Sequence, residues 1–278
     1  MRFEKWQALA NDYVIVEAGE WPAGRADELV PALCDRHRGI GADGVLVLGP
    51  PDEPGYVARL RIFNADGSEA ELSGNGARQA VLYLRRAGWT SERQFSIQTA
   101  AGEVRPTILS DTTCRVDMGR AALLHEGELG GARFQHLTIG NPQTVFEVPD
   151  QAALEALDLG AIGPPVESDP QFPGRTNVSW YAVLGGSAIR ARIFERGVGE
   201  TASSGTGACG AAIVHVLRGG DSPVTVRLDG GELEVDVEDD LHVDLTGWAV
   251  PVFSGRLDAA FGRGGPASGG HVAASGTP

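Results

Sequence analysis

Short runs of β-branched and aromatic residues, separated by glycine, proline or aspartate, recur along the chain. Such runs are typical of strands, because branched and aromatic side chains pack well on a pleated surface. They predict strands over residues 13–17, 45–48, 59–63, 177–184 and 188–194. We therefore expect a chain rich in β structure.

Two apolar segments have helical spacing instead and predict helices over residues 77–87 and 208–218. Each segment is followed by a glycine, Gly88 or Gly219, which suits the left-handed position that closes a helix. The second segment is apolar nearly all round, which is typical of an enclosed helix. It predicts a central helix wrapped by sheet.

The chain contains an internal repeat. Residues 61–77 recur 131 residues later as residues 192–208, with eight of the seventeen positions identical. The match continues from 102–104 and 116–118 to 231–233 and 243–245, which we interpret as a hairpin after each helix. A repeat spacing of 131 residues is in the usual range for one domain, so each copy is expected to form a domain.

The predicted fold class is α+β, with two pseudo-symmetric domains, each a mixed sheet or barrel around a central helix. Residues 1–119 would form the first domain, completed by a strand near 248–257, and residues 120–247 the second. Each half is long enough to bury its own core. From residue 258 to 278 the chain is mainly Gly, Ala, Ser and Pro, which predicts a flexible tail.

Composition limits the partners. The formal net charge is −14, with 42% hydrophobic and 22% charged residues, which argues against nucleic acid or an anionic membrane and favours a small soluble ligand. Three cysteines without a CxxC pair, and no signal-peptide or transmembrane pattern, suggest the cytoplasm. The six histidines have no metal-ligand spacing, so no metal is expected. No other cofactor is expected either, because racemases and epimerases that work by proton transfer of the kind considered below need none.

The repeated Ser-Gly-x-Gly-Ala turn, which begins at Ser73 and at Ser204, is the main candidate for chemistry. A turn that opens a helix leaves backbone N–H groups free, and these with the helix dipole can bind a carboxylate. The bland alternative is that both serines are only N-caps. Two matched turns at one cleft would suit proton transfer to opposite faces of a stereocentre, as in racemases and epimerases.

Several ordered motifs make the chain resemble the diaminopimelate epimerase family over residues 1–257. They are LANDY (9–13), CDRHRGIGADG (34–44), FNADGS (63–68), GNGAR (74–78), GNP (140–142), RTNV (175–178) and ERGVGET (195–201). The family works without pyridoxal phosphate on an amino-acid-like carboxylate, and dimers occur in it, so a homodimer is a further expectation.

The resemblance also implies a set of site residues. Side chains that would hold the amino and carboxylate groups of the substrate are Asn11, Asn64, Asn141, Gln143, Asn177, Glu195 and Arg196. Backbone donors to the carboxylate at the reacting carbon would come from Gly74, Asn75, Gly205 and Thr206. Taken singly, each of these side chains could equally be an ordinary turn residue or a surface ion-pair member.

The sequence departs from the family where the acid and base would stand. The family has cysteines at the positions of Ser73 and Ser204 and a histidine at Gln143. A serine hydroxyl is a poor base without a strong neighbour. If catalysis survives, Glu195 is the best candidate base, ahead of Asp66, Glu69 and Glu200, while Cys209 is expected to be a buried small hydrophobe.

Four functions follow from this reading. The first is an isomerase-class enzyme on an amino acid or related small carboxylate, which has diverged from thiol-based epimerisation. The alternatives are a true diaminopimelate epimerase (LL to meso) with both cysteines replaced by serine, an inactive ligand-binding homologue, and a lyase or cyclase on the same fold.

Overall fold

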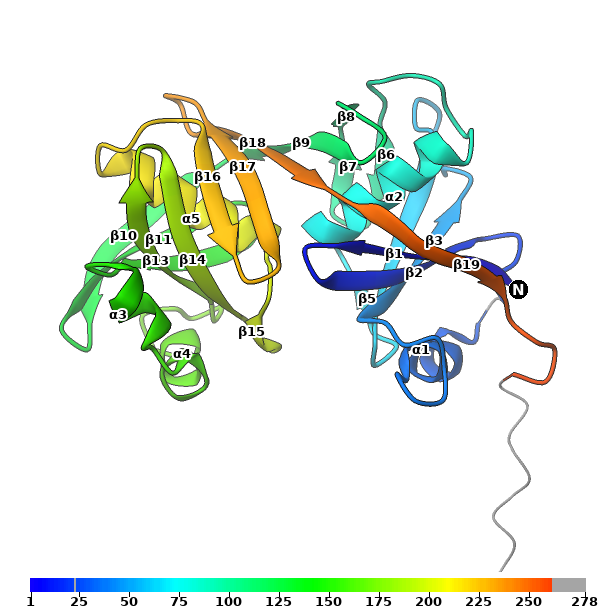
Figure 1. Ribbon diagram of the computed structural model, residues 1–278, viewed down its shortest axis with the longest axis horizontal. Helices are drawn as coiled ribbons and strands as arrows, with labels where there is room; N and C mark the ends of the chain where they lie inside the picture. Colours follow the sequence, from blue (N-terminus) through cyan, green and yellow to red (C-terminus); the bar gives the residue numbers. More distant parts are fainter. Residues whose placement is uncertain (23, 262–278) are drawn as a thin grey trace, which may run out of the picture.

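The structure is a computed structural model that describes residues 1–22 and 24–261 of the 278. It confirms the α+β class, with two large mixed sheets and few helices (Figure 1). No helix in the described residues has the length and apolarity needed to cross a membrane. The tail predicted for residues 258–278 lies, from residue 262 onward, outside the described residues.

The first sheet has eight strands in the order β19-β1-β2-β3-β4-β6-β7, with β5 paired to β4. The strands are β1 (Arg2–Ala8), β2 (Asn11–Glu17), β3 (Gly44–Gly49), β4 (Ala58–Asn64), β5 (Glu69–Ala70), β6 (Ile97–Thr99), β7 (Gly102–Val104) and β19 (Val250–Arg256). The last strand returns from the far end of the chain and pairs antiparallel with β1.

The second sheet has eleven strands in the order β10-β11-β12-β13-β14-β16-β17-β18-β9-β8, with β15 paired to β14. The strands are β8 (Pro106–Ile108), β9 (Thr113–Arg120), β10 (Ala122–Leu129), β11 (Ala132–Thr138), β12 (Pro142–Glu147), β13 (Asn177–Gly185), β14 (Ala188–Glu195), β15 (Gly199–Thr201), β16 (Val224–Leu228), β17 (Gly231–Val237) and β18 (His242–Trp248). All five strands predicted from the sequence are present, in β2, β3, β4, β13 and β14.

The two sheets repeat one pairing pattern. In the first half β2 and β3 are parallel, β3 and β4 antiparallel, and β4 and β6 parallel. In the second half β12 and β13, β13 and β14, and β14 and β16 repeat these three relations in the same order. Residues that occupy equivalent places in this pattern are called twins below.

In the part of the chain that the structure describes, five helices accompany the sheets: α1 (Ala26–Cys34), α2 (Gly74–Arg86), α3 (Gln151–Glu155), α4 (Leu159–Glu167) and α5 (Gly205–Leu217). The predicted helices are α2 and α5, which begin three residues earlier than expected because the turn glycines already belong to them. Helix α5 is buried over almost its whole length and contacts strands of the second sheet on several sides, as its apolar sequence predicts.

The prediction of two equivalent hairpins is only half right. Strands β17 and β18 form the second hairpin. In the first half, however, β7 pairs with β6, whereas β9 leaves for the other sheet and pairs there with β18. Strands β9 and β18 run antiparallel to each other between the two lobes (Figure 1). The chain thus crosses from one lobe to the other twice, at strands that pair with each other.

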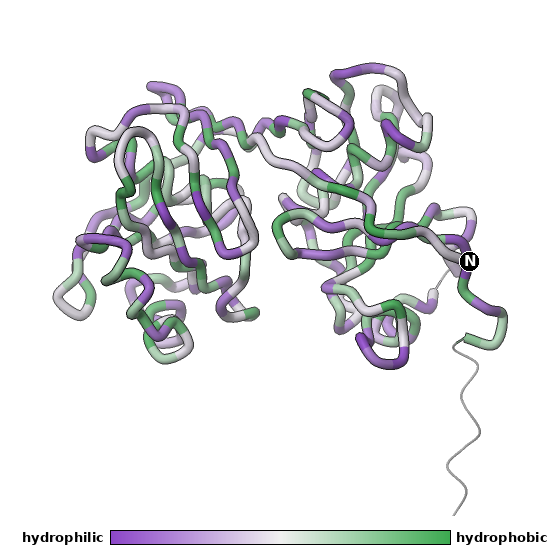
Figure 2. The backbone as a smooth tube through the Cα atoms, in the orientation of Figure 1, coloured by the Kyte–Doolittle hydropathy of each residue, from purple (hydrophilic) through white to green (hydrophobic). Residues whose placement is uncertain are grey.

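The main apolar core extends through both halves. One cluster contains Val81 and Leu84 of α2, Ile213 of α5, and strand residues such as Ile62 and Ile193. Smaller clusters lie under α1 and under the α3 and α4 pair. Hydrophobic stretches follow the strands and central helices, while polar ones concentrate in the connections (Figure 2). The two halves therefore meet through one cluster that includes α2 and α5, while each half also has a smaller cluster of its own.

Candidate functional site

The two repeated turns lie against each other. Ser73 and Ser204 have almost the same backbone conformation, with φ of −135° and −141°. A methyl group added to Gly205 would lie 3.7 Å from the Cα atom of Gly74. The starts of α2 and α5 therefore meet at the junction of the two halves.

Both serines cap their helices. The Gly76 N–H donates to Ser73 Oγ over 3.0 Å, and the Gly207 N–H donates to Ser204 Oγ over 3.3 Å. The alternative interpretation of the two serines as N-caps is therefore confirmed, and it does not exclude a second role. The amides of the first helical residues have no acceptor within their own helix, because a helix begins with such donors. These residues are Gly74 and Asn75 of α2, and Gly205 and Thr206 of α5.

The side chain of Ser73 lies beside the phenol of Tyr13. The Tyr13 hydroxyl donates to Ser73 Oγ over 3.2 Å, and burial raises the pKa of Tyr13 to about 12. The Tyr13 ring packs closely over Gly44, where an added methyl group would lie 2.6 Å from a ring carbon. Since a phenol of this pKa stays protonated near neutral pH, this side of the site can donate a proton but is a poor base.

The surroundings of Ser204 contain a carboxylate. Glu195, at the end of β14, is only partly exposed, and burial raises the pKa of its carboxyl group. The Thr201 hydroxyl donates to Glu195 Oε1 over 2.8 Å, and the Ser204 hydroxyl lies close enough to act as a second donor that lowers the pKa. A carboxyl group with a raised pKa beside one turn is the group expected of a general acid or base.

Gln143 belongs to a small polar cluster at the start of α5. Its Nε2 donates to Asn141 Oδ1 over 2.7 Å and to Thr206 Oγ1 over 3.1 Å, and Asn141 Nδ2 donates to the same hydroxyl over 3.3 Å. Gln143 is fully buried, and its Oε1 has no hydrogen-bond partner among the described residues. Gln143 is also the twin of Tyr13, because each pairs with the first residue of the next parallel strand.

The remaining asparagines of the first half are held by neighbouring loops. Asn11 Nδ2 donates to Asp43 Oδ2 over 2.9 Å, and the Asn11 carbonyl accepts from Gln79 Nε2 over 3.0 Å. Asn64, the twin of Glu195, is exposed and donates to Ser68 Oγ over 3.0 Å. Their predicted role in binding a substrate stays a prediction.

Asn177 and Arg196 are engaged with the backbone. Asn177 Nδ2 donates to the Pro142 carbonyl over 3.0 Å, and its Oδ1 accepts from the Arg196 N–H over 2.9 Å. Arg196 is exposed, and its guanidinium donates to the Gly174 carbonyl over 2.8 Å. In this arrangement neither side chain is turned to a serine, and their binding role also stays a prediction.

The other carboxylates considered as bases are stabilised in the charged form or tied to arginine. Asp66 is exposed and accepts from the backbone and hydroxyl of Ser68, which lowers its pKa. Glu69 and Glu200 form twin ion pairs, with Arg61 and Arg192 respectively. Among the four candidates, only Glu195 combines a raised pKa with a place beside a repeated turn.

The three cysteines are free and buried, and burial raises the pKa of Cys34, Cys114 and Cys209 to about 12 in each case. Cys209 is completely buried in α5, as expected for a small hydrophobe. A thiol with this pKa is protonated near neutral pH and cannot replace the missing thiolate bases.

Two parts of the site were missed by the sequence reading. Tyr13 lies inside a recognised motif, but nothing in the sequence joins it to Ser73. Arg78 lies in another motif and is fully buried at the junction. It donates to Asn75 Oδ1, while Asn75 Nδ2 donates to Ser203 Oγ over 2.9 Å. Ser203 in turn donates to the Leu9 carbonyl over 2.9 Å, so this chain of hydrogen bonds joins the two halves.

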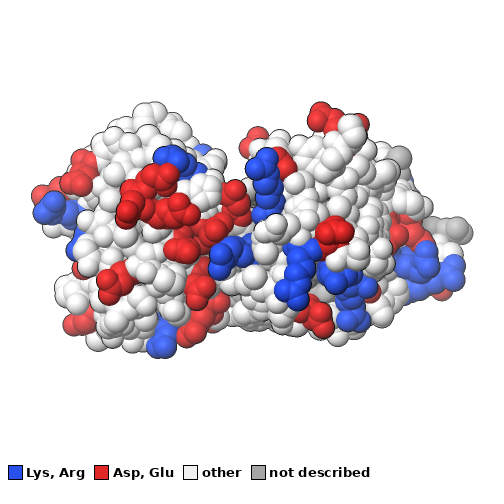
Figure 3. All heavy atoms as spheres, turned by 90° about the horizontal axis from the view of Figure 1, so that it is seen from above, with Lys and Arg blue, Asp and Glu red and all other residues white. Residues whose placement is uncertain are grey.

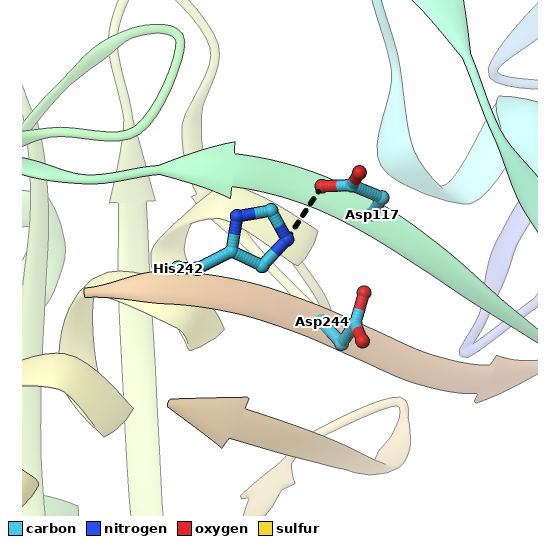
Figure 4. Close-up of side chains that lie close together, drawn as sticks. All are labelled: Asp117, His242 and Asp244. Carbon is cyan, nitrogen blue, oxygen red and sulfur yellow. Dashed lines mark ion pairs between the residues drawn. The ribbon is translucent and has the colours of Figure 1, made fainter. Parts of the chain in front are cut away.

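A group of possible metal ligands lies apart from the turns, on the strands that cross between the lobes. Asp117 of β9, His242 and Asp244 of β18 have ligand atoms within 4.8 Å of one another (Figure 4). His242 Nε2 is 3.1 Å from Asp117 Oδ1, so an ion pair already accounts for their closeness. Asp117 and Asp244 also line a groove of about 590 Å³ beside Arg105 and Arg115. The prediction of no metal stays a prediction.

Charge is distributed unevenly on the face seen in Figure 3. Acidic side chains gather over the second half, on the left, and basic side chains over the first half and the boundary. On this face, therefore, the two lobes differ in charge.

Comparison with known proteins gives a consistent result. The family model for diaminopimelate epimerase matches residues 3–124 and 136–251. The diaminopimelate epimerase of Aromatoleum aromaticum is 37% identical over 276 residues, covering 93% of this chain and 99% of the relative. That of Synechococcus sp. (strain JA-3-3Ab) is 38% identical over 278 residues, covering 92% and 97%.

Solved structures share the fold at low sequence identity. A PhzF-family phenazine biosynthesis protein of Bacillus anthracis has a TM-score of 0.72 at 14% identity, covering 92% of this chain and 99% of that one. A hydroxyproline epimerase of Agrobacterium vitis has a TM-score of 0.68 at 16% identity, covering 94% of each chain.

Proposed function

The chain belongs to the diaminopimelate epimerase family, and we propose that it is a cofactor-independent isomerase that uses Glu195 to move a proton at the carbon beside a carboxylate. The substrate would be an amino acid or a related small carboxylate. It would be bound where the two repeated turns meet, with its carboxylate on the amides that open α2 and α5.

The observation that carries this proposal is the raised pKa of Glu195 beside the Ser204 turn. A base works best when its pKa is near the working pH, and an ordinary glutamate is too weak for this task. Burial raises the pKa of Glu195, while the Thr201 and Ser204 hydroxyls steady its charged form. This combination supports a carboxylate that is a stronger base than an exposed glutamate.

The proton balance is simple. The ionised Glu195 carboxylate removes the proton next to the substrate carboxylate, and the electron pair left on carbon spreads onto the carboxylate oxygens. The amides of the two turns stabilise the added negative charge. The protonated Glu195 then returns its proton to the same carbon or to one conjugated with it, and no oxidant or reductant is needed.

The opposite face would be served by Ser73. Its hydroxyl can donate a proton to the carbanion-like centre, which would invert the stereocentre, and Tyr13 can then resupply it. Solvent would return a proton to Tyr13 and take up the proton held by Glu195. Running the reaction the other way would require an alkoxide or phenolate, which is scarce because the pKa of Tyr13 is about 12. We propose that serines in place of the family's cysteines make the two faces unequal.

Substrate contacts would come from the polar side chains around the turns. Asn141 and Gln143 already bond the Thr206 hydroxyl at the start of α5, which supports a role near the bound carboxylate. We propose that Asn11, Asn64, Asn177 and Arg196 complete the binding surface once a substrate is present.

A second candidate is the unaltered family reaction on diaminopimelate. It is favoured by two relatives that are named diaminopimelate epimerase. They are 37% and 38% identical to this chain, and the match covers nearly their whole length. In this case the two serines alone would prevent epimerisation of diaminopimelate. Replacing them with cysteines tests this directly, as described below.

Exchange of substrate protons with deuterium oxide, followed by NMR, tests the assignment of Glu195. Meso-diaminopimelate is the first probe, followed by other amino and hydroxy acids. The variant Glu195→Gln should lose at least about 100-fold in exchange rate, because a proton-transfer group typically contributes 10²–10⁴-fold. Glu200→Gln on the neighbouring strand β15 is the matched control and should stay active. Full activity of Glu195→Gln would reject the assignment.

A further inference from the structure

Arg78 is a fully buried cation without a counterion. Its Nε and Nη1 atoms have no hydrogen-bond partner, and no salt bridge joins it to a carboxylate, in residues 1–22 and 24–261. Its one described partner is the side-chain oxygen of Asn75. A buried charge that lacks compensation costs several kcal/mol, so its presence at this place requires a physical reason.

One unpartnered nitrogen of Arg78, Nη1, lies beside both repeated turns. A methyl group added to Gly74 would lie 3.9 Å from Arg78 Nη1, and one added to Gly205 would lie 3.8 Å from the same atom. On its other side the guanidinium packs against Gly247 and lies near the thiols of Cys114 and Cys209. Because the cysteines are protonated, they do not neutralise the guanidinium.

Only one of the two repeated segments has an arginine at this position. The twin of Arg78 in α5 is Cys209, which is small and buried. A second arginine at Cys209 would bring two cations together at the junction, whereas one guanidinium can serve both turns. Its field adds to the positive ends of α2 and α5, which face the same place.

We propose that Arg78 is the positioning residue that gives the paired turns their affinity for a carboxylate, acting through the backbone of Gly74 and Gly205. The missing counterion of Arg78 is then the carboxylate of the bound ligand. This inference rests on the proposed function only in taking the turns as the carboxylate site. It adds the residue that makes the site cationic.

The hydrogen bonds of Asn75 explain how the guanidinium is held. Asn75 accepts from Arg78 and donates to Ser203, which precedes the second turn. Arg78 is thereby fixed between the turn that carries it and the turn that it faces. A lysine at this position would keep the positive charge on which carboxylate binding depends and would lose only the planar, forked geometry of the guanidinium.

The test measures carboxylate binding without turnover. Thermal unfolding is followed in sodium acetate and in sodium chloride at equal ionic strength, for the wild type, Arg78→Met, Arg78→Lys and the control Arg86→Met. Arg86 lies at the exposed end of the same helix. The wild type and Arg86→Met should gain stability from acetate beyond chloride. Arg78→Met should bind acetate at least about tenfold more weakly, and Arg78→Lys within about threefold of the wild type.

Three results would overturn the proposal: a wild type that gains nothing from acetate, an Arg78→Met protein that binds acetate like the wild type, or a folded Arg78→Lys protein that has lost binding. If Arg78→Met does not fold, the lysine variant decides. The result is independent of Glu195, since Glu195→Gln should still bind acetate. Failure of the base assignment and failure of the anion site can therefore be told apart.

Discussion

The Ser73 turn and the Ser204 turn share a backbone but not a chemical environment. Their serines differ by only a few degrees in φ and ψ, and each caps a helix of 13 residues. Ser73 accepts a hydrogen bond from a phenol whose pKa is about 12. Ser204 lies beside a carboxyl group whose pKa is raised by burial.

This difference separates what a duplication preserves from what it leaves free to change. The anion-binding amides are part of the helix starts, so both copies keep them as long as the caps and glycines remain. The acid and base groups are side chains from neighbouring strands. Asn64 and Glu195 are twins, as are Tyr13 and Gln143, and each pair now differs in chemistry.

Returning cysteine to both turns would make the two faces equivalent again and should have the largest effect. A helix start lowers the pKa of a thiol, so both thiols of the Ser73→Cys, Ser204→Cys double variant could act as bases. Inversion of LL-diaminopimelate, measured by chiral chromatography, should rise about 100-fold or more over the wild type. Adding Gln143→His should raise it further.

Each single cysteine variant is the control for the pair, because inversion needs a proton-transfer group on both faces. If the double variant inverts LL-diaminopimelate no faster than the wild type, diaminopimelate is not the substrate. The difference between the two faces would then be an adaptation to another acid.

Removing one hydroxyl at a time should expose the difference between the turns. Ser204→Ala removes the hydroxyl that lowers the pKa of Glu195 and should slow deuterium exchange about 100-fold, whereas Ser73→Ala should slow it about tenfold. Since the Ser204 hydroxyl lowers the pKa of Glu195, the acid limb of the pH–rate profile should move to higher pH in Ser204→Ala alone. Both variants lose a cap and about 1 kcal/mol of stability.

The stability loss shared by both variants makes them matched controls for each other. Equal slowing, with the same pH profile in both, would contradict the unequal roles assigned to the two serines.

The pH dependence of stability should report Glu195 independently of any substrate. Its pKa is raised in the folded protein, so the fold binds more protons than the unfolded chain above the ordinary range of glutamate. Stability is therefore lost as pH rises from that range through the folded pKa. Glu195→Gln lacks this loss and should become more stable relative to the wild type as pH rises above the ordinary range of glutamate, by on the order of 1 kcal/mol for each unit by which the folded and unfolded pKa differ.

The measurement is urea unfolding at several pH values. Glu69→Gln is a control of opposite sign, because the ion pair with Arg61 lowers the pKa of Glu69 and its contribution is lost as pH falls. A constant difference between Glu195→Gln and the wild type at every pH would count against the raised pKa.

The smallest effect concerns the residue before each twin asparagine. Ala10 precedes Asn11 with a φ of +62°, whereas Gly140 precedes Asn141 with a φ of +78°. Only glycine adopts this conformation without strain. Ala10→Gly should stabilise the fold by up to about 1 kcal/mol, and Gly140→Ala should destabilise it by about 1 kcal/mol.

Space does not complicate the second substitution, because a methyl group added to Gly140 would meet no atom within 4 Å. Urea unfolding measures both changes. If Ala10→Gly were destabilising, the positive φ at Ala10 would have to be supported by contacts of its methyl group.

Much of the fold could be predicted because its signals are local. The β-branched runs became β2, β3, β4, β13 and β14, and the serines and glycines of the repeat set the starts and ends of α2 and α5. The hairpin after α2 could not be predicted in the same way. The segments 102–104 and 116–118 have hairpin-like sequences, but β7 pairs with β6 and β9 pairs with β18 across the junction.

For the candidate site, too, the local features could be predicted and the long-range contacts could not. Repetition of the Ser-Gly-x-Gly-Ala turn identified both helix starts, and the family motifs singled out Glu195. The sequence could not show that Tyr13 is bonded to Ser73, or that Glu69 and Glu200 are tied up in ion pairs. These contacts join residues far apart in the chain, and their partners depend on how the strands are registered.

By itself, the sequence determined the elements that depend on neighbours within a few residues: the strands, the capped helices, the duplication and the backbone of the two turns. Tertiary structure alone decided that the turns meet, that α2 and α5 share one core, and that Arg78 is buried between them with no carboxylate partner in the described residues. The physical reason is that capping and strand propensity act over a few residues, whereas burial, charge pairing and pKa depend on which distant segments are brought together.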